Sequence, residues 1–210
     1  MKSSLKMGTK RYDGGSVVAN YVLVHGGRSD GHVWSQVVPL LQEHGHHVFC
    51  PTLSRPENSG LSDHISEVCS LIENEDINNV ILVGHSYGGI VITGIADRMP
   101  EKIDRLIYVD SVVPENGKAL YDFFDPAKYG LEPLKPFVEP LYFDEEKIKK
   151  IPKTYIHCKR SEFLEVGEGA FKSVFDRAKQ DNWSYFELNT SHKCMVTQPK
   201  ELTEILLGIK

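Results

Sequence analysis

The apolar run Val80-Ile81-Leu82-Val83 continues directly into Gly84-His85-Ser86-Tyr87-Gly88-Gly89, and an apolar segment from Ile90 to Met99 follows. Four consecutive apolar residues predict a strand buried on both faces, which is typical of a parallel sheet. The segment 90–99 predicts a helix that ends before Pro100. The chain must therefore pass from a buried strand into a helix through one sharp turn, and the glycines leave room for that turn.

In the rest of the chain, apolar segments typical of strands also alternate with amphipathic segments typical of helices. No stretch of sequence is repeated within the chain. The pattern predicts an α/β fold, with about six mostly parallel strands and helices on both faces of the sheet. Further strands are expected at 20–25, 46–50, 103–109, 154–158 and 183–188, and further helices at 33–43, 61–73, 163–179 and 201–209.

One segment, from Pro114 to Pro152, interrupts the alternation. It contains six prolines and many aromatic residues, among them Phe123 and Phe124. A loop of this length in a compact domain is usually a lid or a binding loop, and its aromatic content argues against disorder. We expect a single domain over residues 1–210, with a short cap at about 114–152 over the carboxyl ends of the strands.

Bulk composition excludes several classes of protein. The net charge of −5 and a pI near 6.0 argue against a nucleic-acid partner. No apolar run approaches the ~18 residues of a membrane span, and the polar start of the chain lacks a signal peptide's apolar stretch. The four cysteines match no zinc or redox spacing, so we expect neither metal nor cofactor. These features predict a cytoplasmic protein. They carry no prediction of its oligomeric state.

Ser86 is the predicted nucleophile, because Gly84-x-Ser86-x-Gly88 lies between a strand and a helix. A serine hydroxyl is a weak nucleophile unless a base takes its proton. Of nine histidines, His192 follows the last strand and precedes the final helix, which predicts a place at the carboxyl edge of the sheet beside Ser86. His85 is adjacent in sequence, but we expect its side chain to diverge from that of Ser86.

Backbone N–H groups must stabilise the oxyanion of the reaction. Tyr87, directly after the nucleophile, is one expected donor. The loop after the first strand, His25-Gly26-Gly27-Arg28, is expected to supply the second through Gly27.

These motifs together resemble the α/β-hydrolase superfamily. The segment 21–27, followed by Trp34, and the closing Ser191-His192 look most like the plant-type methylesterase and hydroxynitrile lyase family and its bacterial esterase relatives. The resemblance implies a six-stranded parallel sheet that lacks two antiparallel strands common elsewhere in the superfamily.

The acid that should orient His192 departs from the family pattern. The resemblance places it three residues after the strand 154–158, where this chain has Ser161. Glu162, one residue further, is one replacement. Asp110, at the end of the preceding strand, is the other. Both preserve the chain order of serine, acid and histidine.

The family contains esterases and cyanohydrin-cleaving lyases. The lyases carry a threonine where this chain has Gly26, which favours an esterase. They also carry a lysine after the catalytic histidine, as this chain does at Lys193. We therefore predict a serine hydrolase of small carboxylic esters, with a lyase or a non-catalytic ligand sensor as alternatives. Expected contacts to the small-molecule ester are Gly26, Trp34, Phe123 and Phe124.

Overall fold

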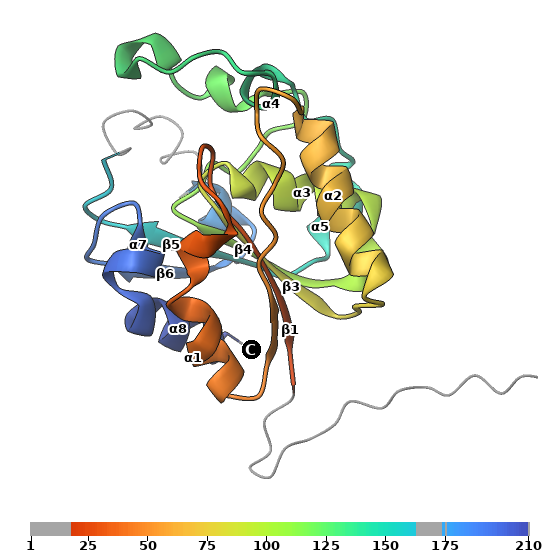
Figure 1. Cartoon of the computed structure of the whole chain (residues 1–210), viewed down its shortest axis with the longest axis vertical. Helices are drawn as coiled ribbons and strands as arrows, with labels where there is room; N and C mark the ends of the chain where they lie inside the picture. The colour runs from red at the N-terminus through yellow and green to blue at the C-terminus, as the bar shows by residue number, and fades with distance from the viewer. Residues whose placement is uncertain (1–17, 163–173, 175, 210) are drawn as a thin grey trace, which may run out of the picture.

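A computed structural model of the chain describes residues 18–162, 174 and 176–209 (Figure 1). Within them, six strands form one parallel sheet in the order β2-β1-β3-β4-β5-β6. The predicted α/β fold with a six-stranded parallel sheet is confirmed. The strands are β1 (Asn20–Val24), β2 (His47–Phe49), β3 (Val80–His85), β4 (Ile103–Val109), β5 (Lys153–Cys158) and β6 (Ser184–Leu188).

The strand order reverses between β1 and β3. From β1 the chain moves outward to β2 and then returns across the sheet to β3 on the other side of β1. The loops that leave β1 and β3 therefore diverge at the carboxyl edge, which is where open α/β sheets bind their ligands. Val24 pairs with Gly84, so the loop after β1 starts beside the loop that carries Ser86.

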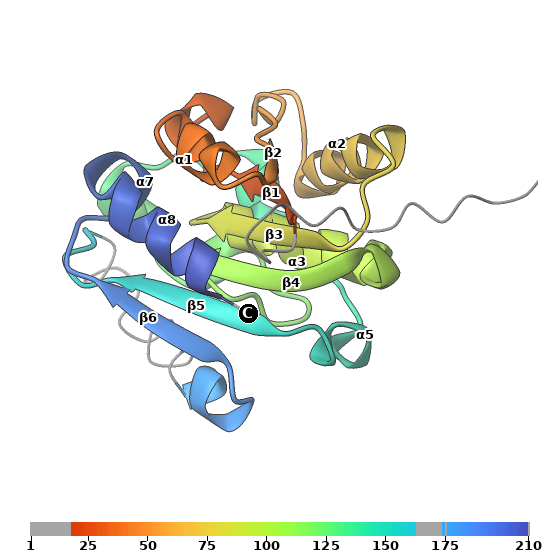
Figure 2. The same ribbon diagram turned by 90° about the horizontal axis from the view of Figure 1, so that it is seen from below.

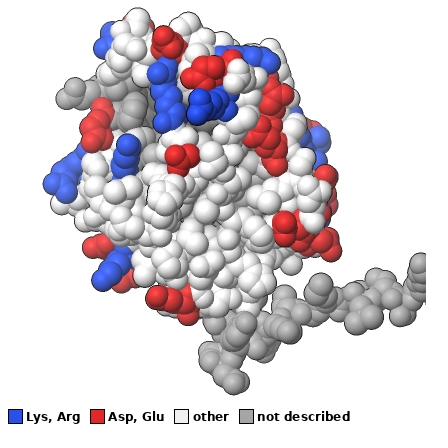
Figure 3. All heavy atoms as spheres, viewed as in Figure 1, with Lys and Arg blue, Asp and Glu red and all other residues white. Residues whose placement is uncertain are grey.

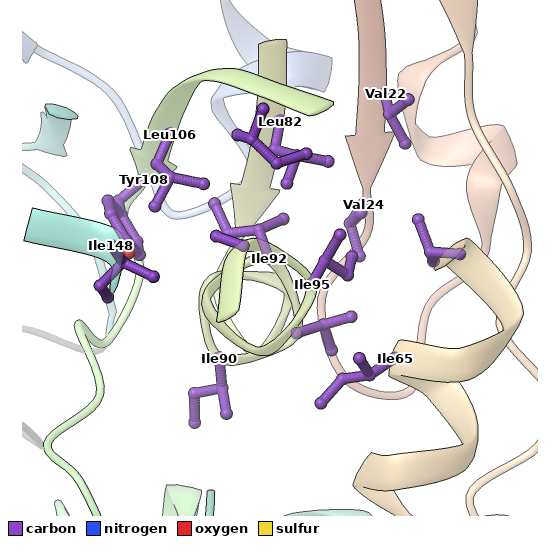
Figure 4. Close-up of a cluster of buried hydrophobic side chains, with 14 of the residues drawn as sticks. Val22, Val24, Ile65, Leu82, Ile90, Ile92, Ile95, Leu106, Tyr108 and Ile148 are labelled. Carbon is purple, nitrogen blue, oxygen red and sulfur yellow. The ribbon is translucent and has the colours of Figure 1, made fainter. Parts of the chain in front are cut away.

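Helices cover both faces of the sheet (Figures 1 and 2). Alternate residues of β1 are buried in different cores: Val22 and Val24 contribute to one, Tyr21 and Leu23 to the other. Figure 4 shows Ile92 and Ile95 of the central helix beside Leu82 and Val24. One face is packed by α2 (Leu61–Asn74), α3 (Gly88–Arg98) and α5 (Glu145–Lys149), and the other by α1 (Val37–Glu43), α7 (Cys194–Thr197) and α8 (Pro199–Gly208).

The single helix predicted over 33–43 was wrong. The structure has a 3-10 turn, η1 (Gly31–Trp34), followed by the separate helix α1. Pro39 is the third residue of α1, where a missing N–H costs no helical hydrogen bond. In one continuous helix the same proline would lie in the interior and clash with the preceding turn.

Three short helical turns lie between β4 and α5, in the segment at the top of Figure 1. A carboxylate from this segment holds the start of α2, because Glu139 Oε2 accepts a 2.9 Å hydrogen bond from the Leu61 backbone N–H. The turns are η3 (Leu120–Asp122), η4 (Pro126–Tyr129) and α4 (Lys135–Val138).

The helix predicted over 163–179 lies largely outside the described residues. In this region the structure describes positions 174 and 176–180, and these are helical. Among the helices that the structure describes, each is too short or too polar to span a membrane.

Candidate active site

Ser86 lies on the sharp turn from β3 into α3 and has a left-handed backbone conformation, with φ of 53°. Such a φ costs a non-glycine residue free energy and is concentrated at functional sites. Gly88 makes the turn possible, since a Cβ there would approach the Val24 carbonyl oxygen to 2.6 Å. The Ser86 backbone N–H donates to the Val109 carbonyl at 3.2 Å, which ties the turn to the end of β4.

The loop after β1 packs directly against this turn. A Cβ added to Gly26 would come within 3.0 Å of the Ser86 Cβ, so the glycine permits the close approach. Gly27 is exposed, and a Cβ added to it would lie 3.6 Å from the Tyr87 Cβ. The two expected oxyanion donors, at Gly27 and Tyr87, therefore flank the nucleophile.

His25 fixes the orientation of this loop. Its Nε2 accepts a 3.0 Å hydrogen bond from the Leu53 backbone N–H, so Nδ1 carries the proton and donates to the Gly26 carbonyl at 2.8 Å. In a trans peptide the C=O and the following N–H point in opposite directions. Holding the Gly26 carbonyl therefore aims the Gly27 N–H away from His25. Burial lowers the pKa of His25, which keeps the ring neutral.

The structure brings Asp110 to the His192 ring. Asp110 Oδ2 lies 2.6 Å from His192 Nδ1, and both side chains are buried. The other carboxylate oxygen accepts the Cys158 backbone N–H at 3.1 Å. Asp110 has a φ of 43° directly after β4, and this left-handed conformation turns its side chain toward the loop of His192. A buried carboxylate at Nδ1 fixes the tautomer in which Nε2 can accept a proton.

Glu162, the other candidate for the acid, contacts the backbone of His192 instead of its ring. Its Oε2 accepts a 3.1 Å hydrogen bond from the His192 backbone N–H. The pKa of the Glu162 carboxyl is lowered by its own backbone N–H and by that of His192. This geometry favours Asp110 as the partner of the ring.

His85 was expected to diverge from Ser86, and the structure shows its ring packed on His192. The two ring centroids are 4.4 Å apart, and His85 Nε2 donates to the His192 carbonyl at 2.9 Å. Among the described residues, His85 Nδ1 has no hydrogen-bond partner. Burial, with the nearby His192, holds the pKa of His85 well below its ordinary value. Sequence adjacency to Ser86 was the available signal, and it did not reveal this contact.

A pocket of about 500 Å³ lies beside the oxyanion donors. Its lining includes Gly26, Gly27 and Tyr87, together with Phe137 from α4, which the sequence did not single out. The Phe137 ring packs edge-to-face on Tyr87 at 5.2 Å. The Tyr87 hydroxyl lies 2.8 Å from His64 Nδ1, and burial raises the Tyr87 pKa well above its ordinary value.

The other expected substrate contacts lie in different surroundings. Trp34 is fully buried and packs edge-on against His85, so we place it in the core and not in the wall of the pocket. Phe124 is half-buried and contacts Tyr121 within the segment 114–152. Phe123 is also half-buried, and Lys193 is exposed at the start of α7.

The expected absence of a metal and of a nucleic-acid partner stays a prediction. No three His, Cys, Asp or Glu side chains among the described residues are grouped as metal ligands. The face drawn in Figure 3 carries acidic and basic side chains close together.

Sequence comparison identifies relatives of this chain. Residues 21–165 match the model of the alpha/beta hydrolase family. A carbendazim-hydrolysing esterase of Nocardioides sp. (strain SG-4G) is 45% identical over 111 residues, which cover 49% of this chain and 46% of the relative. Methylesterase 9 of Arabidopsis thaliana is 34% identical over 105 residues, 46% of this chain and 41% of the relative. The matched chain thus spans less than half the length of these curated relatives.

Structural comparison extends the likeness to nearly the whole chain. An extracellular α/β-hydrolase from a Paenibacillus species superimposes with a TM-score of 0.78 at 20% identity, covering 90% of this chain and 98% of that one. Polyneuridine aldehyde esterase gives a TM-score of 0.70 at 18% identity, covering 91% and 98%. Such low identities support the fold alone. The sheet, the turn at Ser86 and the match over residues 21–165 establish that the chain belongs to the α/β-hydrolase family.

Proposed function

We propose that this protein hydrolyses small carboxylic esters through an acyl-enzyme on Ser86. The observation that carries the proposal is the 2.6 Å contact between His192 and the buried Asp110, on the same sheet edge as the strained turn of Ser86. Esterases among the curated relatives support the same reaction class.

In the first half-reaction, His192 Nε2 takes the Ser86 proton while Oγ attacks the ester carbonyl. The N–H groups of Gly27 and Tyr87 stabilise the oxyanion. Asp110 offsets the positive charge that forms on His192. The imidazolium then protonates the leaving alcohol, which leaves the acyl group on Oγ.

In the second half-reaction, His192 Nε2 takes a proton from water, and the water attacks the acyl carbonyl. The same two N–H groups stabilise the second oxyanion. Collapse of this intermediate releases the carboxylic acid and returns the proton to Ser86.

The segment 114–152 serves as a cap over this site in our proposal. Phe137 supports this role, because it lines the pocket beside the expected oxyanion donors. Phe123 and Phe124 belong to the same segment and are proposed to contact the apolar part of the ester. Because the pocket holds about 500 Å³ and both Tyr87 and Phe137 line it, we propose substrates of small or medium size with an apolar part.

The test measures hydrolysis of p-nitrophenyl esters of graded acyl length, and of carbendazim, by the purified protein. We expect turnover of the short esters, labelling of Ser86 by a fluorophosphonate, and loss of both in Ser86→Ala. A Ser86→Ala variant with full activity would contradict the mechanism. Labelling without turnover would indicate a ligand sensor instead.

The lyase alternative rests on Lys193, which is exposed and caps the start of α7. Gly26 lacks the hydroxyl that the lyases use for the cyanohydrin oxygen. We therefore expect no cyanide release from mandelonitrile under conditions where esters turn over. Rapid cyanide release would favour the lyase.

We also propose a cytoplasmic location. Free thiols at all four cysteine positions support a reducing compartment. Fractionation of cells that express the tagged native protein tests this, and recovery outside the cytoplasm would contradict it.

A further inference from the structure

We propose that Glu162 and His85 are positioning residues that hold the backbone of His192 from two sides and so set the place of its ring. This inference rests on the proposed function. It assigns to Glu162 a role other than that of the acid in the triad, and to His85 a role in the reaction.

The loop of His192 needs partners for its backbone, because it lies between β6 and α7. Its N–H and C=O groups therefore lack the regular bonds of a strand or a helix. In this structure, side chains supply both. The His192 N–H donates to Glu162 at 3.1 Å, and the His192 carbonyl accepts from His85 at 2.9 Å.

The sheet itself brings Glu162 to this place. Beyond the paired ends of β5 and β6, the two following loops continue side by side. The Lys159 N–H donates to the Leu188 carbonyl at 2.8 Å, and the Arg160 N–H donates to the Thr190 carbonyl at 3.0 Å. Two residues further along each loop, Glu162 meets His192.

Three side chains from three neighbouring positions of the sheet thus contact one residue. Asp110, after β4, binds the ring at Nδ1. His85, the last residue of β3, binds the carbonyl, and Glu162, after β5, binds the N–H. Contacts at three separate points fix both the position and the rotation of His192. Since a catalytic group displaced by about 1 Å can lose on the order of 100-fold in rate, each contact affects turnover.

Glu162 and His85, the two partners of the His192 backbone, differ in charge. Each charge state is compatible with a positive charge on the His192 ring. Glu162 is exposed and anionic, so it favours the imidazolium that His192 becomes during turnover. His85 is buried and neutral, which avoids a second positive charge against the same ring. The charged and titratable groups around His192 include Asp110 after β4, Glu162 after β5, His85 of β3, and Lys193 and Cys194 next in the chain. His157 of β5 lies 3.8 Å from the other Asp110 oxygen.

The experiment compares Glu162→Ala with Glu162→Gln in steady-state kinetics on p-nitrophenyl acetate. Glu162→Ala removes the acceptor, and we expect kcat to fall about tenfold while KM stays within about twofold. Glu162→Gln keeps an acceptor oxygen, and we expect most of kcat to return. Both variants remove a negative charge beside the imidazolium, so we expect the acid limb of the kcat/KM profile to move to lower pH.

Glu204→Ala is the matched control, because it removes an exposed carboxylate from α8. It should leave kcat, KM and the pH profile unchanged. His85→Phe keeps a ring against His192 but removes the donor to its carbonyl, and we expect a comparable loss of kcat. If that buried variant does not fold, the two Glu162 variants decide the question.

A wild-type kcat and pH profile in Glu162→Ala would overturn the proposal. So would a Glu162→Gln variant as inactive as Asp110→Asn, because Glu162 would then be the acid of the triad. Failure of the proposed function gives a different result, namely ester hydrolysis that persists in Ser86→Ala.

Discussion

The turn of Ser86 and the loop of His192 meet at one edge of the sheet but are built in opposite ways. The turn depends on its own backbone: a strained φ at Ser86 and a glycine at 88 that tolerates the Val24 carbonyl. The loop depends on side chains distant in sequence, since Asp110 is 82 positions from His192 and His85 is 107 positions away. A local motif can therefore be found in sequence, whereas a site held by distant contacts cannot.

The largest expected effect tests the loop of His192, which is held by side chains distant in sequence. Asp110→Asn would place an amide at His192 Nδ1 and favour the tautomer that carries its proton on Nε2, which cannot accept the proton of Ser86. We expect kcat to fall by about 10⁴-fold, with a thermal melting temperature near that of the wild type. Stopped-flow and steady-state assays on p-nitrophenyl acetate measure kcat, and calorimetry measures the melting temperature. A loss of less than tenfold would refute Asp110 as the acid.

The second prediction tests the turn of Ser86, which depends on its own backbone. Gly88→Ala introduces a Cβ against the Val24 carbonyl, so the turn must shift. We expect the free energy of unfolding to fall by about 1–3 kcal/mol and kcat by roughly 100-fold. Urea denaturation and kinetics on the same preparation measure both. Gly208→Ala, at the end of α8 with open space around it, is the control. Unchanged stability and activity in Gly88→Ala would break the comparison.

A third prediction concerns the contact between the cap segment and the oxyanion donors. Phe137→Leu removes the edge-to-face packing on Tyr87 while keeping an apolar side chain. That packing contributes roughly 0.5–1.5 kcal/mol, so we expect KM to rise about twofold to twelvefold. Tyr142→Leu, in the same segment but exposed and outside the lining of the pocket, is the control. Equal KM values in the two variants would contradict a role for Phe137 in substrate binding.

The smallest expected effect is on the pH dependence of stability. It concerns His85, which precedes Ser86 in the chain and contacts His192 in the structure. Its folded-state pKa lies well below the value of about 6.5 expected in the unfolded chain. Above about pH 6.5 neither state takes the proton, so the free energy of unfolding does not depend on this group. Below that pH only the unfolded chain is protonated, and His85 removes about 1.4 kcal/mol per pH unit.

Urea denaturation between pH 5.0 and 7.5 measures this dependence. The slope below pH 6.5 should be shallower in His85→Phe than in the wild type. It should be unchanged in His44→Gln, which alters an exposed histidine. Identical slopes in His85→Phe and the wild type would show that His85 is protonated in the folded protein.

Much of the fold was predictable because its signals are short in range. Short, mostly apolar segments identified each strand of the described sheet, and β4 was predicted with its observed bounds. The error at 33–43 came from Pro39, whose effect depends on where the helix begins. The short helix α7 was not predicted, because four residues are too few to show a helical period.

The sequence by itself determined that Ser86 lies on a turn between a buried strand and a helix, and that His192 follows the last strand. Both depend on residues within a few positions. Only the tertiary structure decided that Asp110 contacts the ring of His192 while Glu162 and His85 contact its backbone. In the sequence, Asp110 and Glu162 are equally suitable as the acid that orients His192. They differ in the strand that each one follows and in the direction in which the loop after that strand turns. Those properties depend on how the whole sheet is assembled, and no local segment of the chain encodes them.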